Sequence, residues 1–215
     1  MVLKGLLNDT GRKDLVKKIE NFSINEDAAS CYPMQRPYGY TLIINNQTFT
    51  GQTREGRILP EREGSQVDLK NLEDLWKKVG FKVKKYEDLK AHKIYKAAQD
   101  VIEEIEKTQN SSCFVCCIMT HGAMGTIYGS DSELVNIKDI IDFFKESKCP
   151  ALAGKPKLFF IQACREMERL AGQTLSESAS SSQSRFDELS DLSFRRNADP
   201  QEAHFLLGYS TTSGN

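Results

Sequence analysis

Apolar residues follow two patterns along the chain, one typical of buried strands and the other typical of amphipathic helices. Short runs rich in β-branched and aromatic residues predict strands at residues 40–45, 81–86, 112–119 and 157–162. Between these runs, apolar residues recur every three or four positions, the spacing that gives a helix one apolar face. This spacing predicts helices over residues 69–79, 94–105 and 137–144, and Gly80 is placed to end the first of them.

The predicted elements alternate along the chain in the order β, α, β, α, β, α, β. This alternation favours an α/β fold of three layers, α/β/α, in which helices cover both faces of a mainly parallel central sheet. In such sheets, functional groups gather beyond the carboxyl ends of the strands. The residues that directly follow each predicted strand are therefore the first candidates for a site.

Composition changes at both ends of this alternating region, which we place at residues 39–172. Residues 1–38 contain one short helix-compatible stretch and read as a loosely packed leader. Residues 173–200 include a serine-rich tract with too few apolar residues to form a core, which predicts a flexible linker. A strand-like run at 204–210 follows within residues 201–215, without an evident partner strand.

Charge and hydropathy exclude several classes of protein. The chain has 29 Lys and Arg residues and 30 Asp and Glu residues, so its net charge of −1 gives no field that attracts nucleic acid or a membrane surface. The longest unbroken apolar run, at 113–119, is far shorter than the ~20 residues of a membrane helix. The N-terminus turns polar too early for a signal peptide. We therefore expect a cytoplasmic protein whose six cysteines stay reduced.

Three of the six cysteines are crowded at positions 113, 116 and 117, and Cys113 and Cys116 form a C-x-x-C pair that can suggest zinc or redox chemistry. In a strand, however, residues three apart point to opposite faces, and the sequence has no second pair of ligands nearby. We expect these cysteines to pack as small apolar residues, and we expect no metal and no cofactor.

Two residues with reactive side chains directly follow predicted strands. His121 comes after the strand at 112–119, and Cys164 comes after the strand at 157–162. If these strands are parallel neighbours, their carboxyl ends bring the imidazole and the thiol into one crevice. A thiolate can then attack a carbonyl while the imidazole takes and returns a proton. Taken singly, such a histidine is more often a loop residue and such a cysteine more often fills a core.

Three short motifs lie in order along the chain, and two of them contain His121 and Cys164. Gln-Ala-Cys-Arg at 162–165 resembles the caspase active-site signature, which has a histidine about 50 residues upstream. In this chain the histidine lies 43 positions before the cysteine (164 − 121). Thr-His-Gly at 120–122 resembles the family's Ser-His-Gly element, and Arg-Glu-Gly at 62–64 resembles its arginine-containing segment. The similarity covers roughly residues 32–172, with a fainter match at 209–211.

The resemblance implies a thiol protease that hydrolyses peptide bonds after aspartate in apoptotic or related signalling. It assigns Cys164 as the nucleophile and His121 as its base. The backbone N–H groups of Gly122 and Cys164 would form the oxyanion hole, and the Pro60 carbonyl would orient the histidine. Glycine is suited to the first of these roles because a bare backbone can approach the substrate closely.

The resemblance also assigns Arg62 and Gln162 to the pocket for the substrate aspartate. A guanidinium suits this role because its planar fork binds a carboxylate through two hydrogen bonds. Without the resemblance, Arg62 reads as one more solvated charge in a polar loop.

The family's organisation implies four segments in a zymogen. These are a short prodomain at 1–38, a large-subunit catalytic domain at 39–172, an intersubunit linker at 173–200 and the start of a small subunit at 201–215. The implied partners are protein substrates with aspartate at the cleaved bond, a small subunit and a second protomer, which together form a heterotetramer. The short leader resembles the executioner branch of the family.

Cleavage after aspartate also implies self-processing. Asp27 precedes a small residue and is a candidate for removal of the leader, while Asp187 and Asp191 are candidates in the linker. Flexible linkers are commonly rich in acidic residues and serine, so the linker aspartates are also explained by solvation alone.

A different class of function, a caspase-like decoy, also fits the sequence. Family members continue well beyond the position that matches Asn215, and the missing part supplies further pocket residues and the dimer interface. A truncated or weakly active chain that binds a full-length caspase and regulates it is therefore the alternative to a protease. An unrelated α/β ligand-binding domain would require several ordered motifs to be coincidental.

The chain departs from the family at Glu166, where caspases have glycine. A side chain there strains a tight loop, and a carboxylate near Cys164 disfavours both the thiolate and an acidic substrate. We expect Glu166→Gly to increase the rate of cleavage of peptides with a terminal aspartate. The measurement is kcat/KM on such a peptide, and an unchanged or lower value would show that Glu166 is harmless or adapted.

Overall fold

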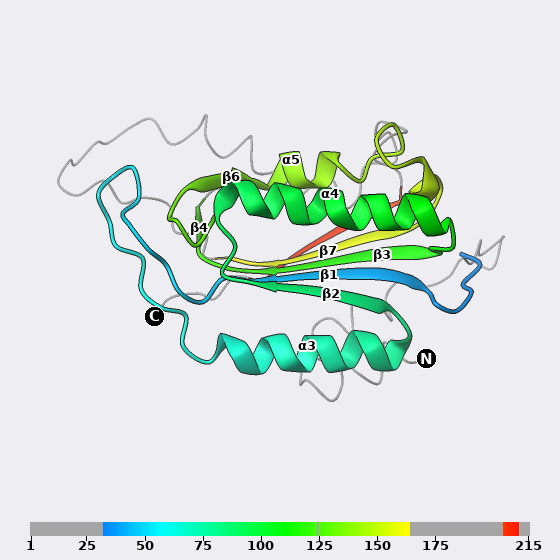
Figure 1. Ribbon diagram of the computed structural model, residues 1–215, viewed down its shortest axis with the longest axis horizontal. Coiled ribbons are helices and arrows are strands. Elements are labelled where there is room, and N and C mark those ends of the chain that lie inside the picture. The colour runs from blue at the N-terminus through cyan, green and yellow to red at the C-terminus, as the bar shows by residue number, and fades with distance from the viewer. Residues whose placement is uncertain (1–31, 124, 164–203, 211–215) are drawn as a thin grey trace, which may run out of the picture. The chain divides into compact units, whose positions relative to one another are not determined.

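The computed structural model describes residues 32–123, 125–163 and 204–210. They lie almost entirely in the second of two compact units of the chain, Pro33–Asn215. A sheet of five parallel strands forms its centre (Figure 1). In spatial order the strands are β2 (Lys82–Glu87), β1 (Gly39–Asn45), β3 (Cys113–Met119), β7 (Lys157–Gln162) and β8 (Phe205–Ser210). This confirms the predicted α/β fold with a mainly parallel sheet.

Helices cover both faces of the sheet, as the alternating pattern predicts. Helix α3 (Ser65–Val79) lies on one face, and α4 (Ala91–Thr108) with α5 (Ile137–Asp142) lies on the other (Figure 1). The short 3-10 helix η1 (Pro150–Leu152) follows α5 and joins the same core as α4. Helix α3 ends where expected, because the N–H of Gly80, at φ 114°, bonds back to the last turn.

The alternation of side chains in β3 divides the apolar core into two parts. Phe114 and Cys116 face the core beneath α4, whereas Cys113 and Cys117 face the core beneath α3. All these side chains are buried. The two cysteines of the C-x-x-C pair thus point to opposite faces, as the strand pattern predicts.

A second, smaller sheet lies at the end of β3. It contains β4 (Gly122–Ala123), β5 (Thr126–Tyr128) and β6 (Leu134–Asn136), all antiparallel. The pattern of apolar residues does not predict this sheet, because strands of two or three residues are too short to show a period.

The strand-like run near the end of the sequence has a partner after all. Strand β8 pairs in parallel with β7, from Lys157↔Phe205 to Gln162↔Ser210. The ring of Phe205 stacks on Phe159 with centroids 6.0 Å apart. The partner could not be found from local sequence, because some forty residues separate the two strands.

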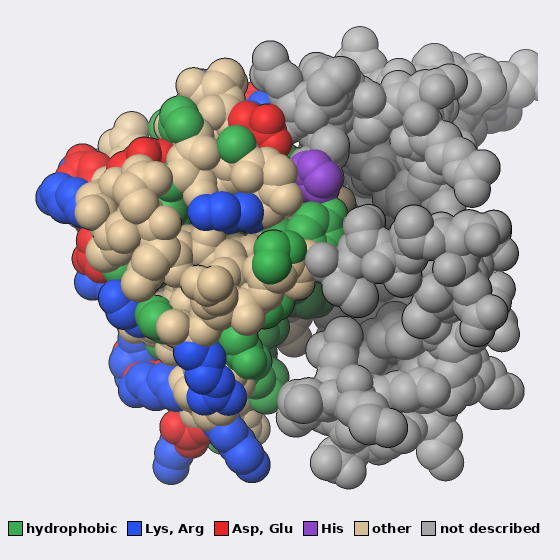
Figure 2. Space-filling view, turned by 90° about the vertical axis from the view of Figure 1, so that its right-hand side faces the viewer, with side chains coloured by type: hydrophobic (Ala, Val, Ile, Leu, Met, Phe, Trp, Pro, Cys, Tyr) green, Lys and Arg blue, Asp and Glu red, His purple; other side chains and the backbone are tan. Residues whose placement is uncertain are grey.

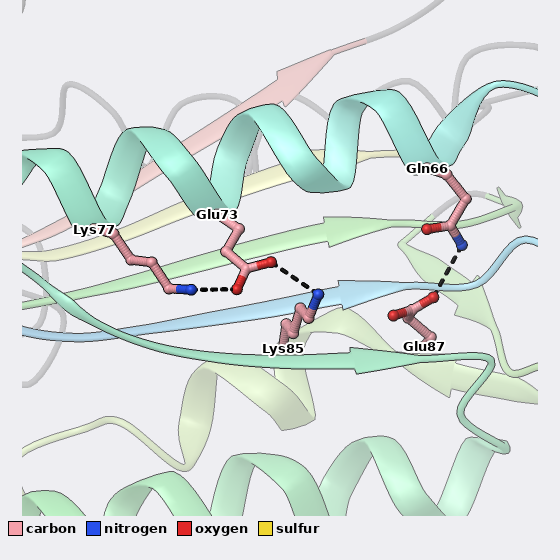
Figure 3. A network of polar contacts seen from close by, with 5 residues as sticks. All are labelled: Gln66, Glu73, Lys77, Lys85 and Glu87. Carbon is pink, nitrogen blue, oxygen red and sulfur yellow. Dashed lines mark hydrogen bonds and ion pairs between the residues drawn. The ribbon is translucent and has the colours of Figure 1, made fainter.

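Strand β2 lies at the edge of the sheet and carries lysines. Glu73 of α3 accepts from Lys77 of the same helix and from Lys85 of β2, the latter at 2.8 Å (Figure 3). These two hydrogen bonds lower the pKa of the Glu73 carboxyl. Charged side chains on an edge strand disfavour pairing with another chain.

Figure 2 shows the end of the described region opposite to the carboxyl ends of the strands. Lysine and arginine side chains gather on its lower part. Helix α3, which ends on this side of the described region in Figure 1, carries Lys77 and Lys78 in its last turn. Cations at this position complement the negative end of the helix dipole.

Several predicted segments lie outside the described residues. They include the leader up to residue 31, the linker over 173–200 and residues 211–215. Across the described ranges, the helices are too short or too polar to cross a membrane.

Lys157 is fully buried at the start of β7, which its place in a Lys-Pro-Lys stretch does not suggest. Its Nζ donates to the carbonyls of Leu152 and Lys155, both at 2.9 Å. It also lies 4.9 Å from the ring centroid of Phe205 in β8. Burial lowers the pKa of this ammonium. Lys157 therefore connects η1, β7 and β8 through one cation.

We expect Lys157→Ala to reduce the free energy of unfolding by about 2–3 kcal/mol, because one buried and one partly buried carbonyl lose a charged donor and a cavity opens. Lys157→Met keeps most of the volume and should cost less. The exposed Lys78→Ala is the control, with a change within about 0.5 kcal/mol. Urea denaturation measures all three, and equal midpoints for Lys157→Ala and Lys78→Ala would contradict the prediction.

Candidate active site

Backbone register brings the carboxyl ends of three neighbouring strands to one level. Asn45, the last residue of β1, pairs with Met119 of β3, and Met119 pairs with Gln162 of β7. Beyond this level the β3–β7 pairing continues through a hydrogen bond from the Thr120 N–H to the Gln162 carbonyl, at 3.1 Å. The residues after these strands are thus held at the same edge of the sheet.

His121 is held at this edge by its backbone and by its ring. Its carbonyl accepts from the Tyr128 N–H at 2.8 Å, which ties it to the small sheet. Its ring Nε2 lies 2.8 Å from the carbonyl oxygen of Pro60. A carbonyl can only accept, so Nε2 carries the proton in this pair and Nδ1 of the neutral ring keeps its lone pair. That lone pair makes Nδ1 a possible base.

The environment of His121 favours the neutral imidazole. Burial is the main cause that lowers its pKa below 6.5, the bond to Pro60 opposes the shift, and the Arg62 charge adds to it. A neutral ring near pH 7 can accept a proton, which a base requires.

Arg62 reaches the same edge from the loop that precedes α3. Its Nη1 donates to the Asn45 side-chain oxygen and to the Asn46 carbonyl, both at 3.1 Å. Its Nη2 donates to the side-chain oxygen of Gln162 at 3.3 Å. The structure therefore brings Arg62, Gln162, Pro60 and His121 together, although Pro60 and Gln162 are about a hundred positions apart in the sequence.

Sequence reasoning missed the side chains that hold Arg62. Asn45 is buried and also donates to Ser65 Oγ at 3.2 Å, and Ser65 in turn donates to Gln47 at 3.2 Å. Asn46, also buried, bonds the backbone of Leu89 and the Tyr128 carbonyl. A polar Asn-Asn pair at the end of a buried strand is the signal that could have identified them, because buried amides need partners.

The remaining predicted site residues are only partly described. Gly122 begins β4 and pairs with Ile127 of β5, directly beside His121. Ala163 is the last described residue before Cys164, which follows the end of β7 by two positions. Cys164 and the candidate processing sites Asp27, Asp187 and Asp191 lie outside the described residues.

The four described cysteines are poor nucleophiles. Cys113, Cys116, Cys117 and Cys149 are all buried. Burial raises the thiol pKa of Cys113, Cys117 and Cys149 to about 12, and that of Cys116 well above its usual value. Almost no thiolate exists at neutral pH with such pKa values. Over the described ranges, no three His, Cys, Asp or Glu side chains are grouped so that they could hold a metal ion.

Comparisons with known proteins identify the family. The sequence pattern of the caspase domain matches residues 38–215. The chain is 36% identical to mouse Caspase-8 over 199 residues, which cover 89% of this chain and 40% of the relative. It is 35% identical to Drosophila melanogaster Caspase drICE over 203 residues, covering 92% and 54% of the two chains. It is 35% identical to cat Caspase-3 over 184 residues, covering 85% and 60%.

The chain therefore belongs to the caspase family of cysteine-type peptidases. It spans between 40% and 60% of the length of these relatives. Their names include both Caspase-8 and Caspase-3, so the matches do not single out the executioner-like branch that the sequence suggested.

We expect His121 to titrate below pH 6.5, because burial disfavours the imidazolium. NMR titration of the histidine ring signals measures this, and His121→Gln identifies the signal. Cys164→Ala provides the background, since it removes the thiol that would couple to the ring. The unfolded chain binds this proton at a higher pH than the folded chain does. The contribution of His121 to the free energy of unfolding therefore declines as the pH falls below 6.5. A midpoint above 6.5 would refute the assignment.

Proposed function

We propose that this chain is a cysteine endopeptidase that cleaves peptide bonds after aspartate, with Cys164 as nucleophile and His121 as base. Membership of the caspase family supports this function. The observation that carries it is the pairing of His121 Nε2 with the Pro60 carbonyl, because this leaves Nδ1 as the acceptor. The pairing occurs at the sheet edge that β7 reaches two residues before Cys164.

In the proposed reaction, His121 Nδ1 takes the Cys164 thiol proton and the thiolate attacks the carbonyl carbon of the scissile bond. Backbone N–H groups of Gly122 and Cys164 stabilise the negative oxygen of the tetrahedral intermediate. His121 then returns the proton to the leaving amine, and a thioester remains. A water molecule, deprotonated by His121, hydrolyses the thioester and restores the thiol.

Arg62 and Gln162 bind the substrate aspartate in this proposal. Their side chains are already connected by a hydrogen bond at 3.3 Å, and Asn45 with Asn46 fixes the guanidinium on another side. A guanidinium held in one orientation loses little entropy when it binds a carboxylate. The Gln162 amide oxygen accepts from Arg62, so its NH₂ group can donate to the substrate.

We also propose the organisation that the family implies. Residues 1–38 act as a prodomain, from which cleavage after Asp27 removes the first 27 residues. Cleavage after Asp187 and Asp191 cuts the chain within the linker over 173–200. Residues 201–215 begin a small subunit, which assembles with the large subunit and a second protomer in the cytoplasm. The executioner-like branch is our prediction for its place in apoptotic signalling.

The test compares the wild-type chain with Cys164→Ala on a fluorogenic peptide that ends in aspartate, under reducing conditions. We expect Cys164→Ala to lower kcat/KM by at least about a thousandfold, because the nucleophile is lost. Cys149→Ala, which removes a buried thiol, is the matched control and should retain activity. The same peptide with asparagine in place of aspartate should be cleaved at least about a hundredfold more slowly, because the carboxylate that pairs with Arg62 is missing.

Equal rates of cleavage of the aspartate peptide by the wild-type chain and by Cys164→Ala would contradict the proposal. A wild-type chain that cleaves neither peptide but changes the activity of an added full-length caspase would favour the decoy instead.

A further inference from the structure

The ring of Phe49 packs against the imidazole of His121. Their centroids are 4.8 Å apart and their planes are tilted by 47°. Phe49 is half-buried in the loop after β1, far from His121 in sequence. We propose that Phe49 is a positioning residue, which acts as a fixed wall that holds the His121 ring in the orientation needed by a base. This inference rests on the proposed role of His121.

One side of the Phe49 loop is fixed by Asp88. The backbone N–H groups of Gln47 and Thr48 both donate to the Asp88 side chain, at 2.7 and 2.9 Å. Asp88 is itself attached to the end of β1, because its own N–H donates to the Asn45 carbonyl at 3.0 Å. The two residues before Phe49 are thus connected to the central sheet through a charged acceptor, which makes stronger hydrogen bonds than a neutral one.

The other side of the loop is fixed by the turn after β5. The Thr50 N–H donates to the Ser130 carbonyl at 2.7 Å, and the Ser132 hydroxyl donates to the Thr50 carbonyl at 3.1 Å. Phe49 therefore lies between two anchored neighbours. Its backbone is held on both sides, so the ring has a fixed point of attachment from which it can constrain His121.

A single hydrogen bond does not define the orientation of an imidazole. The Pro60 carbonyl fixes Nε2, but the ring can still tilt and turn about that contact, which would redirect Nδ1. The Phe49 ring restricts this motion by occupying the space beside one face of His121. Small errors in the position of a base strongly reduce the rate of the reaction that it catalyses. A ring that holds the base in place therefore contributes to catalysis without touching the substrate.

The Phe49 ring covers part of the His121 ring, which agrees with burial being the main cause of the lowered pKa of His121. Arg62 is the charged group that acts on the ring, and it lowers the pKa further. Glu61, next to Pro60, is exposed and accepts from the Gln47 side chain at 2.6 Å. Removal of the Phe49 ring should therefore hydrate His121 while leaving the Arg62 charge in place.

The first experiment is an NMR titration of His121 in the Cys164→Ala chain, with and without Phe49→Ala. We expect Phe49→Ala to raise the pKa of His121 toward 6.5, because water then reaches the ring. Phe49→Tyr, which keeps the ring, should restore the original pKa. Phe143→Ala is the matched control, since Phe143 is half-buried beside α5 and packs on Tyr95 instead. An unchanged pKa in Phe49→Ala, or an equal shift in Phe143→Ala, would overturn the proposal.

The second experiment measures peptide cleavage by the same variants with Cys164 restored. We expect Phe49→Ala to lower kcat by about tenfold with KM changed less than about twofold, and Phe49→Tyr to recover the rate. A rise in KM with kcat unchanged would contradict a positioning role. If circular dichroism shows that Phe49→Ala is unfolded, Phe49→Leu replaces it with the same expected directions.

The two experiments separate this inference from the proposed function. The titration needs no activity, so a wild-type chain that cleaves nothing would refute the protease while a raised pKa in Phe49→Ala still supports the wall. An active wild-type chain with normal kcat and normal His121 pKa in Phe49→Ala would refute the wall alone.

Discussion

The in-register pairing of β1, β3 and β7 is the constraint on which the site depends. These strands end at Asn45, Met119 and Gln162, which are Cα partners across the sheet. Parallel backbone hydrogen bonds connect the strands at this level. The buried apolar residues on both faces fix the register, because a slip of one residue would move every side chain of a strand to the opposite face of the sheet. A packed core thereby determines the position of polar groups at the edge.

Buried polar residues extend this order from the strands to the loops. Asn45 ends β1, Asn46 follows it, and both accept hydrogen bonds from Arg62. Asn46 also bonds Leu89, two residues before α4, and Tyr128, the last residue of β5. Asp88 and Ser130 then hold the loop of Phe49 from two sides. Within the described residues, the loop after β1 and the segments before α4 and after β5 are thus connected to the sheet by satisfied hydrogen bonds. Such connections leave a site with little freedom to lose when a substrate binds.

Lys157 connects neighbouring elements in a similar way at the opposite end of β7. It joins η1 to the start of β7 and lies against Phe205, so β8 is connected to the sheet by a buried cation as well as by its backbone. A charge in such a place costs free energy unless every donor has a partner. Its carbonyl acceptors and the aromatic ring offset that cost.

The sequence by itself determined the order along the chain of the long strands and the helices, the opposite faces of Cys113 and Cys116, and the candidates His121, Pro60, Arg62 and Gln162. The period of the apolar residues predicts which face of an element is buried, and motifs indicate candidate functional residues by residue type and spacing. Only the tertiary structure decided that Phe49 packs on His121, that Asn45 binds Arg62, that Lys157 is buried and that β8 pairs with β7. These contacts join residues that are distant in the sequence, and no local pattern records which distant residues the folded chain brings together.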